Sequence, residues 1–205
     1  MPFPLRLAVV AIAAFALGGA AALLLVPGAR EALFSPVRSV VTGTALIGGP
    51  FSLTDHTGKR VTDQDFRGRY TLVFFGFVFC PDVCPAGLQV MTEAMERIGP
   101  EKAGRITPIF ISVDPERDTP AELKEFVKSF HPRLVALTGT PAEVAAAAKA
   151  YRVIYRRVKD EKSKAGYTVD HSTFFYLMGP DGKFITHYTH SVRPEVLAER
   201  LAALR

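Results

Sequence analysis

The sequence feature that most constrains the fold is an apolar run that ends in two closely spaced cysteines. Residues 70–79 are almost entirely apolar, which is typical of a strand covered on both faces. The run leads into Cys80 and Cys84, and an amphipathic helix is expected to begin near Pro85. Since the chain has 2 cysteines in 205 residues, all of its thiols lie at one strand-to-helix junction. This placement indicates thiol chemistry or a soft-metal site rather than a structural disulfide.

Strands and helices alternate through the region after residue 44. We expect a hairpin, a strand–helix–strand unit around the cysteines, two further helices, and a terminal hairpin followed by a closing helix. The segments behind this expectation are residues 51–61, 70–77, 85–98, 106–113, 120–130, 134–137, 141–150, 152–158, 172–178, 184–188 and 194–204, with a polar loop at 159–170. Their order predicts an α/β fold, a thioredoxin-like sandwich in which helices flank a central mixed sheet, with an insertion.

The N-terminal region differs from the rest in composition. Residues 7–26 carry no charge and no proline, and about 20 apolar residues suffice for a helix that spans a bilayer. With the positive N-terminus inside the cell, we expect residues 1–27 to be a single-pass anchor in the inner (cytoplasmic) membrane, 28–44 a linker, and 45–205 one domain in the periplasm. A signal peptide cleaved near the alanines at 20–22 is the alternative, although the apolar run exceeds the ~7–15 residues of a signal core.

The charge balance argues against one class of partner. The formal net charge is +5, and the basic residues are scattered among nearly as many acidic ones. Without a basic stripe interleaved with aromatic residues, nucleic acid is not an expected partner. The mixed segment 156–162 fits a solvated surface, with the docking of an acidic partner as the alternative. Export would also place the cysteines outside the reducing cytosol, where a thiol pair can oxidise.

The two cysteines are spaced to act together. In a turn-like backbone, Cys80 and Cys84 would have Cα atoms about 6 Å apart, which suits either a redox-active disulfide or shared binding of one ion. A helix that begins near Pro85 would favour thiolate over thiol. Two thiolates form a soft pair that selects Cu(I) or Zn over Mg or Ca. Met91 and Met95 are also soft donors, but their helical spacing places them in the core.

A third ligand must come from elsewhere in the chain, and imidazole is the natural donor. His171 stands directly before the predicted strand at 172–178, and in a thioredoxin-like sandwich that strand begins beside the cysteine loop. Either Asp170 or a main-chain carbonyl could orient its ring. The remaining histidines are assigned to an exposed turn (His56), an exposed helix end (His131) and the terminal hairpin (His187 and His190), where a secondary metal contact is the alternative.

Together these motifs resemble the SCO/SenC family of copper-binding assembly proteins for cytochrome c oxidase. The matching segments are residues 76–85, 112–119, 169–172 and 179–184. The resemblance implies a thioredoxin-like fold and one copper ion, as Cu(I) or Cu(II), bound by Cys80, Cys84 and His171. It also implies delivery of copper to the dinuclear copper site of oxidase subunit II, or maintenance of that site's thiols. Other periplasmic copper carriers are further candidate partners.

Two functions of different classes remain open. A metallochaperone, with no catalytic residue, would hold copper and release it by stepwise ligand exchange; oxidation of the Cys80–Cys84 pair to a disulfide would abolish Cu(I) binding. A thiol-disulfide oxidoreductase would instead reduce cysteines of a periplasmic target, with Cys80 attacking and Cys84 resolving. The three residues between the cysteines, and a histidine where such reductases place a proline, favour the chaperone. Enzyme activity and oligomeric state stay open.

Overall fold

The apolar run before the cysteines forms β3 (Tyr70–Gly76), an interior strand of the main sheet. In the computed structural model, which describes residues 46–163 and 165–205, every residue of β3 after Tyr70 is buried. The strand pairs in parallel with β4 (Ile106–Ser112) and antiparallel with β8 (Phe174–Met178). Because it has a neighbour on each side and a covered face above and below, its continuous apolar character follows from its position.

The described residues form a seven-stranded mixed sheet. The other strands are β1 (Ser52–Asp55), β2 (Arg60–Thr62), β5 (Val135–Thr138) and β9 (Phe184–Thr189), and the order is β2-β1-β5-β4-β3-β8-β9. β3, β4 and β5 run parallel, whereas the pairs β1–β2, β1–β5, β3–β8 and β8–β9 are antiparallel. Parallel neighbours need crossover connections, and helices supply them. The predicted N-terminal hairpin is confirmed.

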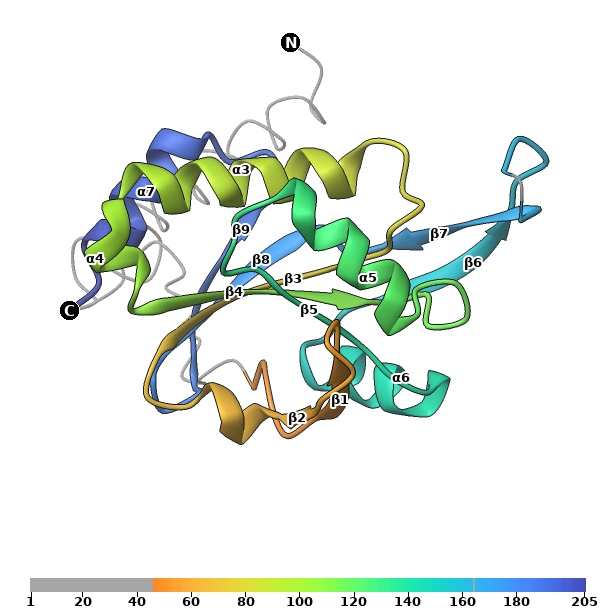
Figure 1. The fold of residues 1–205 in the computed structure, drawn as a ribbon, viewed down its shortest axis with the longest axis horizontal. Coiled ribbons are helices and arrows are strands. Elements are labelled where there is room, and N and C mark those ends of the chain that lie inside the picture. Colours follow the sequence, from red (N-terminus) through yellow and green to blue (C-terminus); the bar gives the residue numbers. More distant parts are fainter. Residues whose placement is uncertain (1–45, 164) are drawn as a thin grey trace, which may run out of the picture. The chain divides into compact units, whose positions relative to one another are not determined.

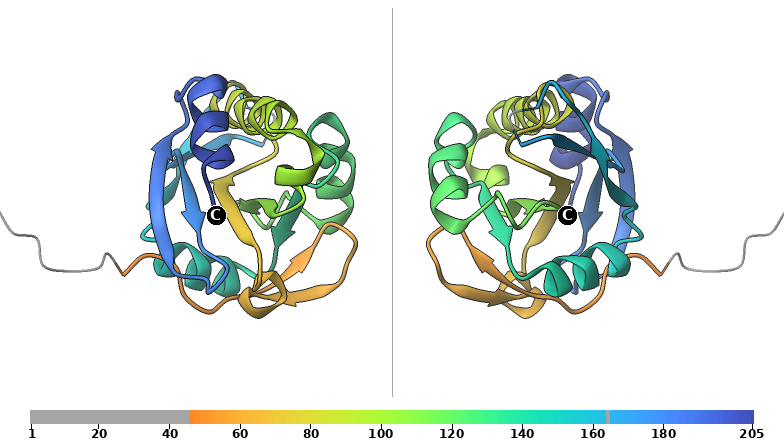
Figure 2. Two further views of the ribbon diagram at one scale, coloured as in Figure 1. Left: turned by 90° about the vertical axis from the view of Figure 1, so that its left-hand side faces the viewer. Right: turned by 90° about the vertical axis from the view of Figure 1, so that its right-hand side faces the viewer.

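Helices cover both faces of this sheet (Figures 1 and 2). Phe74 faces the helix that follows the cysteines, since its ring carbon would lie 3.2 Å from a Cβ at Gly87. Phe75, the next residue along the strand, faces the opposite side, where its ring centroid lies 5.3 Å from that of Tyr151. The helices are α3 (Val83–Arg97), α4 (Gly99–Ala103), α5 (Pro120–Phe126), α6 (Pro141–Ala150) and α7 (Pro194–Ala202), with 3₁₀ turns at Asp63–Phe66 and Val127–Ser129.

The insertion between α6 and β8 is a hairpin that forms its own two-stranded sheet, β6 (Tyr155–Lys159) with β7 (Tyr167–His171). The predicted polar loop at 159–170 is therefore wrong in its second half, and the following strand begins at Phe174 rather than at Ser172. One residue of β7, Val169, is buried, so the segment lacks the apolar run that identifies an interior strand. Figure 1 shows this hairpin extending beyond the main sheet.

Two predictions about the core have opposite outcomes. Met91 and Met95 are buried in α3, as their spacing predicted. His131 was expected at an exposed helix end but is buried, because its surroundings satisfy its polar groups. Its backbone N–H donates a hydrogen bond to Thr92 Oγ1 at 3.1 Å, and its ring Nδ1 accepts one from the Arg133 N–H at 3.2 Å.

The N-terminal predictions concern residues that the structure does not describe. The expected anchor at 1–27 and the expected linker at 28–44 both lie outside residues 46–163 and 165–205. Within those described ranges, no helix combines the length and the apolar character needed to cross a membrane.

Candidate metal centre

Cys80 and Cys84 lie where β3 gives way to α3. The helix begins at Val83, two residues before the predicted Pro85, so Cys84 lies in its first turn and Cys80 in the loop before it. The Cys84 N–H is too early in the helix to have an intrahelical acceptor, and it donates to Cys80 Sγ at 3.4 Å. Cys84 is fully buried and Cys80 is partly exposed. The pair therefore presents one thiol to the surface and keeps the other in the core.

Gly76, the last residue of β3, makes room for the buried thiol. A Cβ at this position would lie 2.7 Å from Cys84 Sγ and 2.8 Å from a ring carbon of Phe110. Both distances are shorter than real carbon contacts, so a larger residue would displace the sulfur or the ring. Glycine is needed here because of this close approach rather than for an unusual backbone angle.

The imidazole reaches the sulfurs from the hairpin. His171 is the last residue of β7, and its Nε2 lies 3.3 Å from Cys84 Sγ. Its Nδ1 lies 3.0 Å from the main-chain oxygen of Ser172. Since a carbonyl can only accept, Nδ1 carries the proton and the lone pair of Nε2 faces the sulfurs. A main-chain carbonyl thus orients the ring, while the Asp170 carboxylate pairs with Arg156 at 3.1 Å instead.

Aromatic residues of β3 and its extension fix the plane of this imidazole. The His171 ring lies edge-on to Phe77, with centroids 5.8 Å apart, and edge-on to Phe74 at 6.3 Å. The backbone beyond the ring is held as well, because the Ser172 N–H donates to the Ile154 carbonyl at 2.9 Å. Protein contacts therefore hold both the imidazole ring and the backbone of the residue that follows it.

The structure brings the three predicted ligands together. The ligand atoms of Cys80, Cys84 and His171 all lie within 4.8 Å of one another. Sulfur and imidazole donors lie about 2.0–2.3 Å from the ion in zinc sites, so atoms at this spacing need only small movements to share one ion. Among the described residues, this is the one group of three or more His, Cys, Asp or Glu side chains with such geometry. His187 and His190 are not part of it.

The two thiols differ in acidity. A hydrogen bond from the Cys84 thiol, together with the backbone N–H groups of the turn, holds the pKa of Cys80 well below its ordinary value of 9.0 despite partial burial. The same pairing, together with burial, raises the pKa of Cys84 above its ordinary value. Cys80 is therefore the thiolate of the copper-free pair. Cys84 must lose its proton when a soft ion binds both sulfurs.

The buried carboxylate of Asp118 holds the loop between β3 and α3, residues 77–82, here called the thiol loop. Asp118 Oδ2 accepts hydrogen bonds from the Val78 N–H at 3.0 Å and from Ser112 Oγ at 2.6 Å. Burial raises the pKa of Asp118 to about 6, although these two hydrogen bonds act in the opposite direction. Asp118 thus links the loop that carries Cys80 to the end of β4. Asp118 belongs to the segment 112–119, one of those that carry the family resemblance.

A family model described as SCO1/SenC matches residues 40–205 of the chain. The chain belongs to the SCO1/SenC family. The human mitochondrial protein SCO1 homolog is 44% identical over 192 residues, which are 92% of this chain and 63% of the human protein. This chain therefore spans less than two thirds of that relative's length.

Solved structures of relatives share the fold. Arabidopsis thaliana ScoI with copper bound is 44% identical, with a TM-score of 0.72 over 76% of this chain and 96% of that one. Bradyrhizobium japonicum ScoI with copper bound is 46% identical, with a TM-score of 0.70 over 76% of this chain and 97% of that one. These similarities confirm the predicted family and the thioredoxin-like α/β fold with its mixed sheet.

Proposed function

We propose that this protein is a copper chaperone for the assembly of cytochrome c oxidase, and that it binds one copper ion through Cys80, Cys84 and His171. The observation that carries the proposal is the convergence of the three donor atoms within 4.8 Å. Two thiolates and one imidazole fit Cu(I) and also accommodate Cu(II). Family membership and the copper in the relatives' structures support the choice of copper over zinc.

The recipient that we propose is the dinuclear copper site of oxidase subunit II. In this proposal residues 1–27 hold the protein in the inner membrane as a single-pass anchor with its N-terminus inside, and the metal site faces the periplasm. The uncharged run at 7–26 supports the anchor. Other periplasmic copper carriers would supply the ion.

The arrangement of the ligands suits stepwise exchange. Cys80 is partly exposed and ionised, so it makes the first bond to an incoming ion and is open to an incoming ligand. Cys84 is buried and gives up its proton as the ion enters. A three-ligand site leaves a coordination position open, and a thiolate or imidazole of the recipient can occupy that position before His171 or one sulfur is released.

A thiol-disulfide oxidoreductase is the second candidate, and the acidity and exposure of Cys80 favour it. The Cys80 thiolate would attack a target disulfide, form a mixed disulfide and release one target thiolate. Cys84, after losing its proton, would then attack Cys80, release the second target thiolate and leave a Cys80–Cys84 disulfide. Both cysteines are free thiols in this structure. The imidazole 3.3 Å from Cys84 would act in this exchange only as the base for the Cys84 proton, whereas in a metal site it is a ligand; the copper bound in the relatives' structures favours the metal site.

The two functions separate in one transfer experiment. The full-length chain in detergent is loaded with one equivalent of Cu(I) and mixed with the copper-free soluble domain of subunit II, whose site cysteines are either reduced or disulfide-bonded. After separation, copper and free thiols are counted on each protein. We expect copper on the reduced target. Copper that stays on the donor, while the copper-free chain reduces the oxidised target at the expense of its own two thiols, would favour the oxidoreductase instead.

A further inference from the structure

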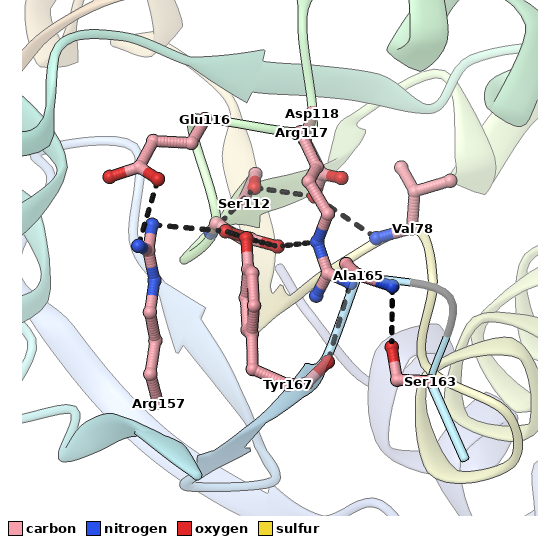
Figure 3. Close-up of polar contacts among 10 residues, drawn as sticks. Val78, Ser112, Glu116, Arg117, Asp118, Arg157, Ser163, Ala165 and Tyr167 are labelled. Carbon is pink, nitrogen blue, oxygen red and sulfur yellow. Dashed lines mark hydrogen bonds and ion pairs between the residues drawn. The ribbon is translucent and has the colours of Figure 1, made fainter. Parts of the chain in front are cut away.

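One turn of the chain contacts both segments that carry the ligands. Residues 112–118, here called the bridging turn, connect β4 to α5. Its last residue, Asp118, holds the thiol loop through the Val78 N–H. Two other residues of the turn, Asp114 and Arg117, contact the hairpin that carries His171. Figure 3 shows Arg117 beside Tyr167 of that hairpin. The bridging turn therefore contacts both segments that carry the ligands without supplying a ligand itself.

Tyr167, the first residue of β7, makes the main contact on the hairpin side. Its hydroxyl donates to Asp114 Oδ1 at 3.0 Å, and the Arg117 guanidinium carbon lies 4.1 Å from the centre of its ring. The Arg117 Nε pairs with the Asp114 carboxylate, so the three side chains form one closed group. From β6, Arg157 pairs with Asp114 at 3.5 Å and with Glu116 at 2.8 Å, and it lies 4.7 Å from the Tyr167 ring.

The Arg117 guanidinium also lies against aromatic residues that precede Cys80. The Arg117 guanidinium carbon lies 5.3 Å from the ring centre of Phe79 and 5.7 Å from that of Phe77. These rings flank Val78 in the segment that runs directly into Cys80. One cation is thus shared between the aromatic residues before the first thiol and the aromatic residue at the start of β7.

The burial of this group makes its geometry demanding. The Asp114 side chain is fully buried and that of Arg117 is 15% exposed. A buried charge is costly unless its partners are well placed, and an apolar contact of similar size often serves stability as well or better. The buried contacts among Asp114, Arg117 and Tyr167 are therefore better explained by a role in orienting the hairpin than by stability alone.

The geometry of β7 links the position of Tyr167 to that of His171. Side chains alternate along a strand, so Tyr167, Val169 and His171 share one face of β7, and Val169 in the middle of that face is the buried residue of the strand. At about 3.3 Å per residue, Tyr167 and His171 lie about 13 Å apart. In the described part of the chain, the ladder of this hairpin is separate from the main sheet. An isolated hairpin is only marginally stable, so contacts such as those of Tyr167 decide its orientation.

We infer that Asp114, Arg117 and Tyr167 are positioning residues of the metal centre, which set the distance of His171 from the two sulfurs. The inference rests on the proposed function in naming copper as the ion. Loosening the group should let the hairpin move and should convert a three-ligand site into a two-sulfur site, although no ligand has been altered.

The test uses two variants of the full-length chain. Tyr167→Phe removes only the hydroxyl, and Arg117→Lys keeps the charge but loses the planar fork and its stacking. One equivalent of Cu(II) is added, and the imidazole nitrogen coupling is read by electron paramagnetic resonance. The rate of Cu(I) loss to a chelator is measured separately. We expect weaker nitrogen coupling and about 10-fold faster loss in each variant, the scale typical of residues that orient metal ligands.

Tyr70→Phe is the matched control. The Tyr70 hydroxyl also donates a hydrogen bond, to the main-chain oxygen of Arg205 at 2.6 Å, and a guanidinium, that of Arg105, lies 5.9 Å from its ring. Tyr70 begins β3 and so lies at the end of that strand away from the cysteines. The control should leave the copper spectrum and the rate of copper loss unchanged.

A copper-free readout separates this inference from the proposed function. Deuterium uptake of peptides covering β6 and β7 should rise in Tyr167→Phe and Arg117→Lys, and it should stay at the wild-type level in Tyr70→Phe. Failure of the wild-type chain to bind copper would overturn the proposed function and, with it, the copper role assigned here. Wild-type copper spectra and loss rates in both variants would overturn the inference alone, and so would unchanged uptake in the hairpin.

Discussion

The two halves of the metal centre are held in place by different kinds of contact. The sulfurs lie at the junction of β3 and α3, where Cys84 is fully buried and Gly76 is fitted closely against it. The imidazole lies on a hairpin with its own small sheet, in which Val169 is the buried residue of the ligand-bearing strand. Packing fixes the first half, and ion pairs, hydrogen bonds and stacking fix the second.

This difference bears on which ligand can move. Disturbing a well-packed core costs about 2–5 kcal/mol for each large side chain removed, whereas one hydrogen bond to a charged group, such as that from Tyr167 to Asp114, contributes about 1.5–3 kcal/mol. Moving the hairpin is therefore cheaper than moving the cysteine pair. In a chaperone that exchanges ligands stepwise, the imidazole is then the ligand whose release requires the least rearrangement of the protein.

Substituting a ligand in the packed half of the metal centre should have the largest effect on copper binding. Cys84→Ser replaces a buried soft donor with a hydroxyl, so the affinity for Cu(I) should fall by more than about 100-fold. Because the smaller hydroxyl fills less of the space that Gly76 leaves for the sulfur, the free energy of unfolding should also fall by about 1 kcal/mol. Competition with a Cu(I) chelator and urea unfolding measure the two effects. Cys80→Ser is the matched control, because it should lose copper without losing stability; Cu(I) affinity retained in both variants would contradict the site.

Breaking the hairpin half should have a smaller effect on Cu(I). His171→Ala leaves both sulfurs in place, so Cu(I) affinity should fall by about 10–100-fold. The coloured Cu(II)–thiolate form should disappear, because Cu(II) depends more on nitrogen donors. His187→Ala, which alters a histidine of β9 outside the cluster, should leave both signals intact. Equal copper binding in the two variants would remove the imidazole from the site.

The different acidities of Cys80 and Cys84 can be tested on the unsubstituted chain. Because the pKa of Cys80 lies well below 9.0, alkylation of the copper-free chain by iodoacetamide should already be at its plateau at neutral pH and should slow only in acid. Cys84, with a raised pKa and no exposure, should react only after unfolding. Mass spectrometry of each cysteine across about pH 4–9 measures this. A Cys80 rate that climbs steadily between neutrality and pH 9 would indicate an ordinary thiol.

The smallest effect on copper is expected behind the thiol loop, at Asp118. Its pKa is raised from 3.8 to about 6, so the folded protein retains a proton that the unfolded chain releases. The associated stability is fully present below the unfolded pKa and is lost as pH rises through about 6; over that window it amounts to about 3 kcal/mol at most.

Asp118→Asn should therefore flatten the pH dependence of the urea midpoint between about pH 4 and pH 7, while Cu(I) affinity changes by less than about threefold. Asp181→Asn is the control, because Asp181 is exposed and its pKa is lowered. A pH dependence that survives in Asp118→Asn as it does in the control would show that another group is responsible.

The sequence is more informative about the packed half than about the hairpin. A continuous apolar strand, two cysteines and an amphipathic helix are local patterns, and each was predicted close to where it lies. The sequence predicts the start of α3 near Pro85, and the helix begins two residues earlier. Proline is tolerated anywhere in the first turn, where no intrahelical acceptor is needed, so the helix can begin at Val83.

The hairpin half depends on contacts that no local pattern encodes. β7 has a single buried apolar residue, so it resembles a polar loop in sequence. The hydrogen bond from Tyr167 to Asp114 joins residues 53 positions apart, and nothing near either residue predicts the other. His171 was nevertheless placed beside the cysteines, because the expected order of strands brought that part of the chain to the end of β3.

The central claim is that one imidazole and two sulfurs bind the same copper ion. X-ray absorption at the copper edge, on the full-length chain loaded with one equivalent of Cu(I), measures this most directly. We expect two sulfur neighbours and one imidazole nitrogen, with the imidazole contribution lost in His171→Ala. A spectrum with sulfur neighbours alone, identical in the wild-type chain and the variant, would contradict the claim.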